Sequence, residues 1–248
     1  MKKLIIPITV VVAVAITSCD VLESAANDIL TTDGSGTSEP SLTEAEVSSG
    51  LKEALSVGIT NAVDLTSVTD GFLGNAAIRL PFPEEAIKVK EKALEWGLDG
   101  QVEKFETTLN RAAESASKEA LPIFKNAITS MSIQDAFGIL NGGDGAATSY
   151  LKNKTTNELV TAFRPKVDAA IAEVKLTNAW EPIINKYNTA MTFTGGEKLN
   201  PDLGDYVTRK AITGMFYMVE KEENKIRKDP VARVSELLQK VFGSITGN

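Results

Sequence analysis

The sequence predicts an all-α protein, an irregular bundle of about eight to ten helices behind a signal peptide and a flexible tether. Three observations predict this class. After Pro40, apolar residues recur every three or four positions in nearly every segment, which is the spacing of one helix face. No segment alternates apolar and polar residues as a half-buried strand does. No fixed-period repeat divides the chain, so residues 41–248 are expected to form a single all-helical domain.

The first 18 residues are typical of a bacterial export signal. Lys2 and Lys3 precede an apolar stretch from Leu4 to Ile16, which is shorter than the ~20 residues of a membrane-spanning helix. The stretch ends in a lipobox, an aliphatic residue and two small residues followed by Cys19. We therefore expect cleavage before Cys19 and lipidation of its thiol. The alternative is an ordinary secretory signal or an uncleaved anchor.

Residues 19–40 are then expected to be the lipidated cysteine and a flexible linker, because residues 31–40 are small, polar and free of aromatic side chains. The lipid would attach the domain to a membrane of the cell envelope. The outer membrane, with the domain in the periplasm, is the expected location.

Charge and composition exclude several classes of function. The formal charge is −7, from 26 basic and 33 acidic side chains. Loss of Lys2 and Lys3 with the signal leaves 24 basic and 33 acidic ones, or −9, which excludes a basic footprint for nucleic acid. With no histidine and one cysteine, the chain cannot form a Ser-His-Asp centre, a histidine metal site or an internal disulfide. We expect no cofactor, no metal and no catalytic constellation.

The first half of the domain is read as four helical segments. A capping box at Ser41 and Glu44 opens a helix to about Val68, in which Gly50 and Gly58 allow close approach of a neighbour. Residues 70–83 are the least helical part and form a loop or a short extended segment. Pro83 suits the first turn of the next helix. An amphipathic stripe runs from Gln101, Pro122 restarts or kinks it, and Ser132 caps a short helix that stops at residues 141–143.

The second half is read as four more helices. One runs from about Thr156 with a bend at Pro165, and another starts at residues 177–178 around Trp180. The stretch from Asp202 to about Lys228 is apolar on more than one face, which predicts a central helix. A last helix opens at residues 229–230.

Candidate site residues are charged groups that lie beside apolar runs, and each either pairs internally or lines a cleft. Internal pairing is the favoured interpretation. These residues are Arg79, Arg111, Arg164, Asp205, Lys210 and Arg233. Tyr150, Tyr187 and Tyr206 could complete a polar pocket, although tyrosine rings in helical proteins mostly lie in the core.

Two further stretches invite a functional reading. The turn at residues 141–148 could hold an anion on its backbone N–H groups, but it lacks the lysine of a phosphate-binding loop, and a helix stop followed by a cap explains it better. The charged run 220–227 resembles a metal cluster only by its number of carboxylates. Its mixed signs favour a solvated helix face.

Five stretches together resemble a bacterial family known as domain of unknown function 4197. They lie at residues 50–55, 77–81, 109–114 and 139–150, and the last combines 205–208 with 226–233. The resemblance covers about Thr43 to Phe242 and implies an exported helical protein, often with a lipoprotein signal. It supplies no activity. It does imply that six residues are candidates for a shared polar cluster, structural or binding: Arg79, Asn110, Arg111, Tyr150, Asp205 and Arg233.

The leading hypothesis is a non-enzymatic module of the cell envelope, tethered to the membrane, that binds a protein partner or a small amphipathic ligand. One alternative is a hydrolase or lyase that uses carboxylates and arginine, for which Arg79, Arg111 and Asp205 would have to converge. The other is a structural envelope assembly protein.

Overall fold

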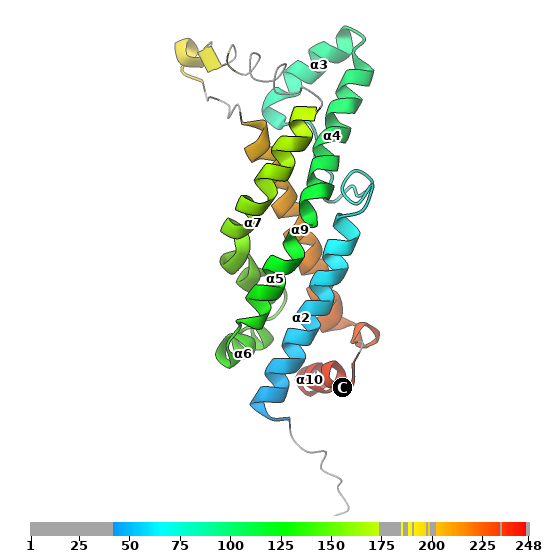
Figure 1. Ribbon diagram of the computed structural model, residues 1–248, viewed down its shortest axis with the longest axis vertical. Coiled ribbons are helices and arrows are strands. Elements are labelled where there is room, and N and C mark those ends of the chain that lie inside the picture. Colours follow the sequence, from blue (N-terminus) through cyan, green and yellow to red (C-terminus); the bar gives the residue numbers. More distant parts are fainter. Residues whose placement is uncertain are drawn as a thin grey trace, which may run out of the picture. The chain divides into compact units, whose positions relative to one another are not determined.

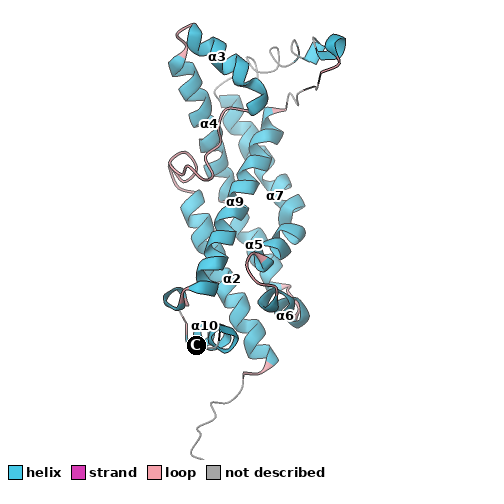
Figure 2. Ribbon diagram, turned by 180° about the vertical axis from the view of Figure 1, so that it is seen from behind, coloured by secondary structure: helices cyan, strands magenta, loops and turns pink. Residues whose placement is uncertain are grey.

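Every regular element that the structure describes is a helix (Figures 1 and 2). The computed structural model describes residues 42–173, 202–233 and 235–246, with a few more between 185 and 198. The α-helices in these ranges are α2 (Glu44–Thr66), α3 (Ile87–Glu95), α4 (Asp99–Ser117), α5 (Ala120–Thr129), α6 (Ile133–Asn141), α7 (Ala146–Glu173), α9 (Leu203–Lys228) and α10 (Glu236–Thr246). Two 3-10 helices, η1 (Glu84–Ala86) and η2 (Pro230–Ala232), accompany them. The all-α prediction is confirmed.

Several predictions concern residues outside the described ranges. These are the signal peptide, Cys19, the linker, and the helix around Trp180 with Tyr187. None of the described helices is both long enough and apolar enough to span a membrane.

Four antiparallel rods make up the bundle: α2, α4 continued by α5, α7, and α9 (Figure 1). Helix α2 packs against α9 and α5, while α7 packs against α4, α5 and α9. The break between α4 and α5 falls just before Pro122, which lies in the first turn of α5, where a missing N–H is tolerated. The predicted restart at Pro122 is therefore confirmed.

The core fills the space between the four rods with large apolar side chains from every rod. Phe124 of α5 meets Phe216 of α9 edge to face, with ring centroids 5.6 Å apart. Met215 and Phe216 are both buried on α9, together with residues on its other faces. This helix is central, as its apolar pattern predicted.

The starts of α2 and α6 are set by capping boxes, and the one at α2 is shifted from its predicted place. The capping box of α2 is formed by Thr43 and Glu46, two residues after the predicted one at Ser41 and Glu44. Both pairs have the required three-residue spacing. The Ser132 cap is confirmed, because its side chain accepts a hydrogen bond from the backbone N–H of Asp135.

Two other boundaries differ from prediction. Helix α7 begins at Ala146, ten residues before the predicted start at Thr156, and continues through Pro165. The C-terminal region is divided, because η2 follows Asp229 and α10 begins only at Glu236. Helix α10 then packs against α2.

The two glycines of α2 lie where neighbouring helices approach closely, as predicted. A Cβ atom built on Gly50 would lie 2.9 Å from Cγ2 of Val241 on α10. One built on Gly58 would lie 3.4 Å from Cδ1 of Ile226 on α9, an ordinary van der Waals distance. Gly50 is therefore required by the packing of α10, whereas Gly58 leaves room for a methyl group.

Candidate functional site

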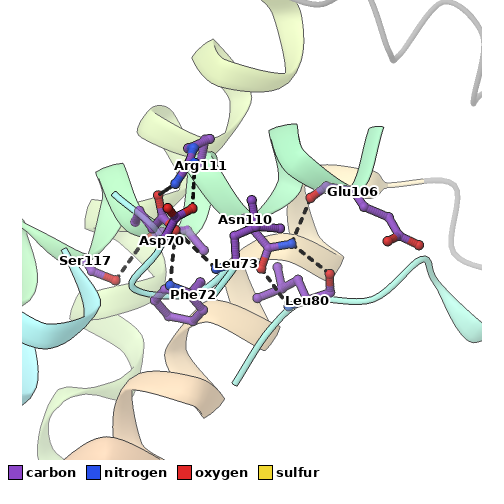
Figure 3. Close-up of polar contacts among 10 residues, drawn as sticks. Asp70, Phe72, Leu73, Leu80, Glu106, Asn110, Arg111 and Ser117 are labelled. Carbon is purple, nitrogen blue, oxygen red and sulfur yellow. Dashed lines mark hydrogen bonds and ion pairs between the residues drawn. The ribbon is translucent and has the colours of Figure 1, made fainter. Parts of the chain in front are cut away.

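Helix α4 holds the loop between α2 and η1 through buried polar side chains (Figure 3). The fully buried Asn110 accepts a hydrogen bond from the backbone N–H of Leu80 at 2.8 Å and donates one to the carbonyl of Leu80 at 2.9 Å. It also donates to the carbonyl of Glu106, one turn earlier in α4. The amide therefore satisfies both backbone groups of Leu80, as a neighbouring strand would.

Glu114 and Arg111 hold the start of the same loop at Asp70, Phe72 and Leu73, which Figure 3 labels together with Arg111. The buried carboxylate of Glu114 accepts hydrogen bonds from the backbone N–H groups of Phe72 and Leu73, at 3.1 and 3.2 Å. Arg111 pairs with Glu114 at 2.6 Å and with Asp70 at 2.8 Å. These two carboxylates, Glu114 foremost, raise the pKa of Arg111. Asp70 has a φ of 66°, so this ion pair also fixes a turn in the left-handed region.

Two more predicted residues help to hold this loop, one within it and one on α9. Arg79 pairs with Glu106 of α4 at 3.2 Å, and Lys90 of α3 reaches the same carboxylate at 2.6 Å. The hydroxyl of Tyr206 donates a hydrogen bond to the carbonyl of Pro81 at 3.3 Å. Four of the candidate residues, Arg79, Asn110, Arg111 and Tyr206, are thus brought together around one loop, and their contacts hold it in place.

Arg164 and Asp205 take part in contacts at the start of α9. Arg164 of α7 pairs with Asp168 at 2.7 Å and with Asp202, the N-cap of α9, at 2.8 Å. Asp205 pairs with Arg209 at 2.8 Å. The three charges required for a hydrolase, those of Arg79, Arg111 and Asp205, therefore belong to three different ion pairs. This arrangement favours the internal-pairing interpretation over the catalytic one.

Three candidates remain among the described residues. The ammonium group of Lys210 on α9 lies 5.9 Å from the centre of the Tyr206 ring. The other two, Tyr150 and Arg233, lie elsewhere in the bundle. Tyr150, near the start of α7, is half-buried beneath the ammonium group of Lys154, and burial raises the pKa of its phenol. Arg233, which is buried after η2, donates hydrogen bonds to the carbonyls of Ile226 and Arg227 at the end of α9. Neither joins the group around the loop through a contact described here.

The turn between α6 and α7 does hold an anion, and that anion belongs to the chain itself. The carboxylate of Glu223 on α9 accepts hydrogen bonds from the backbone N–H groups of Ala147 and Thr148, at 3.0 and 2.9 Å, and from the Thr148 hydroxyl at 2.8 Å. Arg227 pairs with Glu223 at 3.0 Å and donates to the carbonyl of Ile139 at the end of α6. The helix start and helix stop are therefore both satisfied by α9.

This arrangement corrects the interpretation of residues 220–227 as a solvated face. Glu222 and Glu223 are both buried, at 7% and 6% exposure. Glu222 accepts a hydrogen bond from Asn61 of α2 at 3.1 Å. Among the described residues, no group of three or more potential ligands is placed to hold a metal ion. The buried carboxylates act in helix packing.

One apolar pocket lies between α2 and α9, beside this ion pair. The empty space here is about 350 Å³ when the open solvent at its mouth is included, and the room for water-sized molecules is only about 20 Å³. Almost fully buried side chains line the pocket, including those of Leu51, Leu55 and Ile226. Gly58 is also part of the lining.

The turn between α3 and α4 exposes apolar side chains that the sequence analysis did not single out. Trp96 is 72% exposed, and Leu94 and Leu98 beside it are 39% and 36% exposed. Gly97 has a φ of 73°, its N–H bonds the carbonyl of Leu94, and the N–H of Leu98 bonds the carbonyl of Ala93. These bonds are the Schellman ending of a helix, which fixes the backbone on both sides of Trp96.

The comparison with protein families agrees with the resemblance. Residues 41–243 match the sequence profile of a family described as protein of unknown function (DUF4197). The chain belongs to this family. No curated protein and no solved structure matches it. Membership of DUF4197 therefore adds a name for the helical domain, whereas a function has to be argued from the surface of the domain itself.

Proposed function

We propose that this chain is a lipid-anchored, non-catalytic module of the bacterial cell envelope that docks a protein partner. The single observation that supports docking is the exposed apolar tip formed by Leu94, Trp96 and Leu98. Large aromatic side chains on a rigid turn are typical centres of protein interfaces, because little conformational entropy is lost when they bind. The polar candidates, in contrast, are occupied by contacts within the fold.

The anchor is the second part of the proposal and rests on the lipobox at residues 16–19. Lipidation of Cys19 would hold the domain at a membrane, with the outer membrane and the periplasm as the proposed location. Globomycin treatment is expected to accumulate the uncleaved precursor, and Cys19→Ala is expected to abolish lipidation and membrane fractionation. Unchanged processing in both experiments would contradict the anchor.

Docking is tested by photocrosslinking with the full chain in bacterial cells. A benzophenone amino acid in place of Leu98 is expected to yield a discrete protein adduct. The matched control is the same replacement at Ile133 of α6, an isolated apolar residue that is 46% exposed. Trp96→Ala should reduce the adduct from position 98 about 30-fold, because anchor side chains contribute about 2 kcal/mol or more. Equal adducts from both positions, or none from position 98, would overturn the proposal.

A further inference from the structure

We infer that Glu106 is a positioning residue for the apolar tip, because its carboxylate holds α3 on α4 and so sets the direction in which Trp96 faces. This inference rests on the proposed docking function and adds what controls the docking surface. Glu106 lies on α4, outside the tip itself, and acts through Lys90 of α3.

The tip belongs to the end of α3 and joins α4 through one residue. The N–H of Leu98 bonds the carbonyl of Ala93, which is one of the bonds that end α3. The carbonyl of Leu98 accepts a hydrogen bond from the N–H of Val102, in the first turn of α4. Trp96 therefore moves with α3 whenever α3 turns about Leu98. The direction of the tip depends on how α3 packs on α4.

Little apolar packing holds α3 on α4. Helix α3 lies along α4, at the end of the bundle opposite the start of α2 (Figure 1). None of its side chains that the structure describes is buried, and Ile87 and Leu94 are 37% and 39% exposed. Just before η1, the ring of Phe82 contacts that of Phe105 on α4, with centroids 4.5 Å apart. A segment with so few buried side chains opens at a low cost in free energy, so a single polar contact can decide its position.

Glu106 provides that polar contact. Its carboxylate pairs with the ammonium group of Lys90 on α3 at 2.6 Å and with the guanidinium of Arg79 in the loop at 3.2 Å. The side chains of Glu106 and Lys90 are only 13% and 31% exposed. One turn along α4, Asn110 binds both backbone groups of Leu80, the residue after Arg79 (Figure 3). Glu106 therefore joins α3 to a part of the fold that is already fixed.

The size of the effect follows from the exposure of the ion pair. Loss of a partly exposed ion pair changes a conformational equilibrium by about two- to five-fold. Only molecules with α3 packed on α4 present the tip in its docking direction, so the apparent affinity for a partner falls with their fraction. Glu106→Gln removes the carboxylate from both ion pairs, whereas Lys90→Met removes only the contact with α3.

The test measures the crosslinked adduct from position 98 of the full chain. Glu106→Gln and Lys90→Met are each expected to lower the adduct about two- to five-fold and to speed hydrogen exchange of the α3 amides in the purified protein. Glu106→Asp keeps the carboxylate and should retain more adduct than Glu106→Gln. The matched control is Glu119→Gln, because Glu119 pairs with Lys166 of α7 at 3.2 Å and does not contact α3 through this pair. Its adduct should equal that of the wild type.

Each other outcome overturns the inference in a recognisable way. An adduct that both variants leave unchanged would show that docking does not depend on Glu106, with the docking function intact. A fall with Glu106→Gln but not with Lys90→Met would show that Glu106 acts through the loop. A fall that accompanies a larger loss of Tm than in Glu119→Gln would assign Glu106 to global stability. Absence of any adduct in the wild-type chain would instead reject the proposed docking function.

Discussion

Gly50→Ala and Gly58→Ala form a matched pair of substitutions that tests the packing of α2 against two different helices. Both replace a glycine inside the same helix, so both gain about 1 kcal/mol of intrinsic helix stability. They differ in what the new methyl group meets. At Gly58 it enters the apolar pocket at ordinary contact distances from α9. At Gly50 it meets Val241 at 2.9 Å and Leu237 at 3.1 Å, both on α10.

The expected magnitudes follow from these distances. Burial of the methyl group at Gly58 adds up to about 0.8 kcal/mol, so the variant should gain about 1–2 kcal/mol of unfolding free energy. Overpacking at Gly50 costs about 1–3 kcal/mol and displaces two side chains of α10, so the expected net result is a loss of about 0–2 kcal/mol. For a domain of this size, Tm should rise by about 2–8 °C for Gly58→Ala and fall by up to about 8 °C for Gly50→Ala.

Thermal unfolding followed by circular dichroism at 222 nm measures both values, and hydrogen exchange localises them. Gly138→Ala on α6 is the control, because a Cβ atom there meets nothing within 4 Å and only helix propensity changes. Faster exchange confined to the amides of α10 is expected for Gly50→Ala. If Gly50→Ala instead stabilises the protein as much as Gly58→Ala does, α10 does not close on α2 and the packing argument is refuted.

Three further predictions concern carboxylates. Glu223→Ala leaves the partly buried guanidinium of Arg227 without its carboxylate partner. The unfolding free energy measured by urea titration should therefore fall by about 3–5 kcal/mol. A loss below about 1 kcal/mol would show that Glu223 does not hold α7 to α9. Glu114→Ala should lower the unfolding free energy by about 2–4 kcal/mol, because the backbone N–H groups of Phe72 and Leu73 lose their acceptor. The freed loop should be cleaved by protease within residues 70–80. A loop that stays uncleaved would show that Glu114 does not hold it. The capping hydrogen bonds lower the pKa of the carboxyl groups of Glu46 and Asp135 from their ordinary values of 4.5 and 3.8. The stability that these two carboxylates contribute is therefore fully present above the unfolded pKa values and is lost as the pH falls through the lower folded ones. The double variant Glu46→Gln, Asp135→Asn should accordingly show a weaker loss of stability at acid pH in a pH–stability curve.

Local chemistry made most of the helical fold predictable. The apolar spacing identified α4, the apolar residues on several faces identified α9, and the start of α6 followed from the single capping residue Ser132. The capping box of α2 was misplaced by two residues because two equivalent patterns overlap at residues 41–46. Which of the two patterns caps the helix depends on how the helix packs against its neighbours, and apolar periodicity alone does not reveal this.

Long-range partners account for what the sequence analysis missed. The first ten residues of α7 have a weak apolar stripe. The start of this helix is capped by Glu223, which accepts hydrogen bonds from the backbone N–H groups of Ala147 and Thr148. These two residues precede Glu223 by 76 and 75 positions in the sequence. Nothing in the run 220–227 distinguishes that buried carboxylate from a solvated one. The burial of Asn110 likewise depends on the backbone of Leu80, 30 residues away.

Trp96 illustrates the opposite case, an apolar residue whose exposure could have been anticipated. A glycine directly after a helix ends it in the left-handed region, so the residue before it lies at the corner of the turn rather than on the buried stripe. Residues 94–98 have this pattern, Leu-Glu-Trp-Gly-Leu. The signal was present, but a tryptophan among leucines is usually assigned to the core.

Most of the stretches that carry the family resemblance take part in two groups of polar contacts. Residues 77–81 and 109–114 form the hydrogen bonds between the loop and α4. Residues 139–150 and 226–233 contribute to the hydrogen bonds that join α6, α7 and α9. The resemblance therefore reports what holds the bundle together. Trp96 lies outside all five stretches, so a search for function that follows the resemblance alone would pass over the tip that the surface singles out.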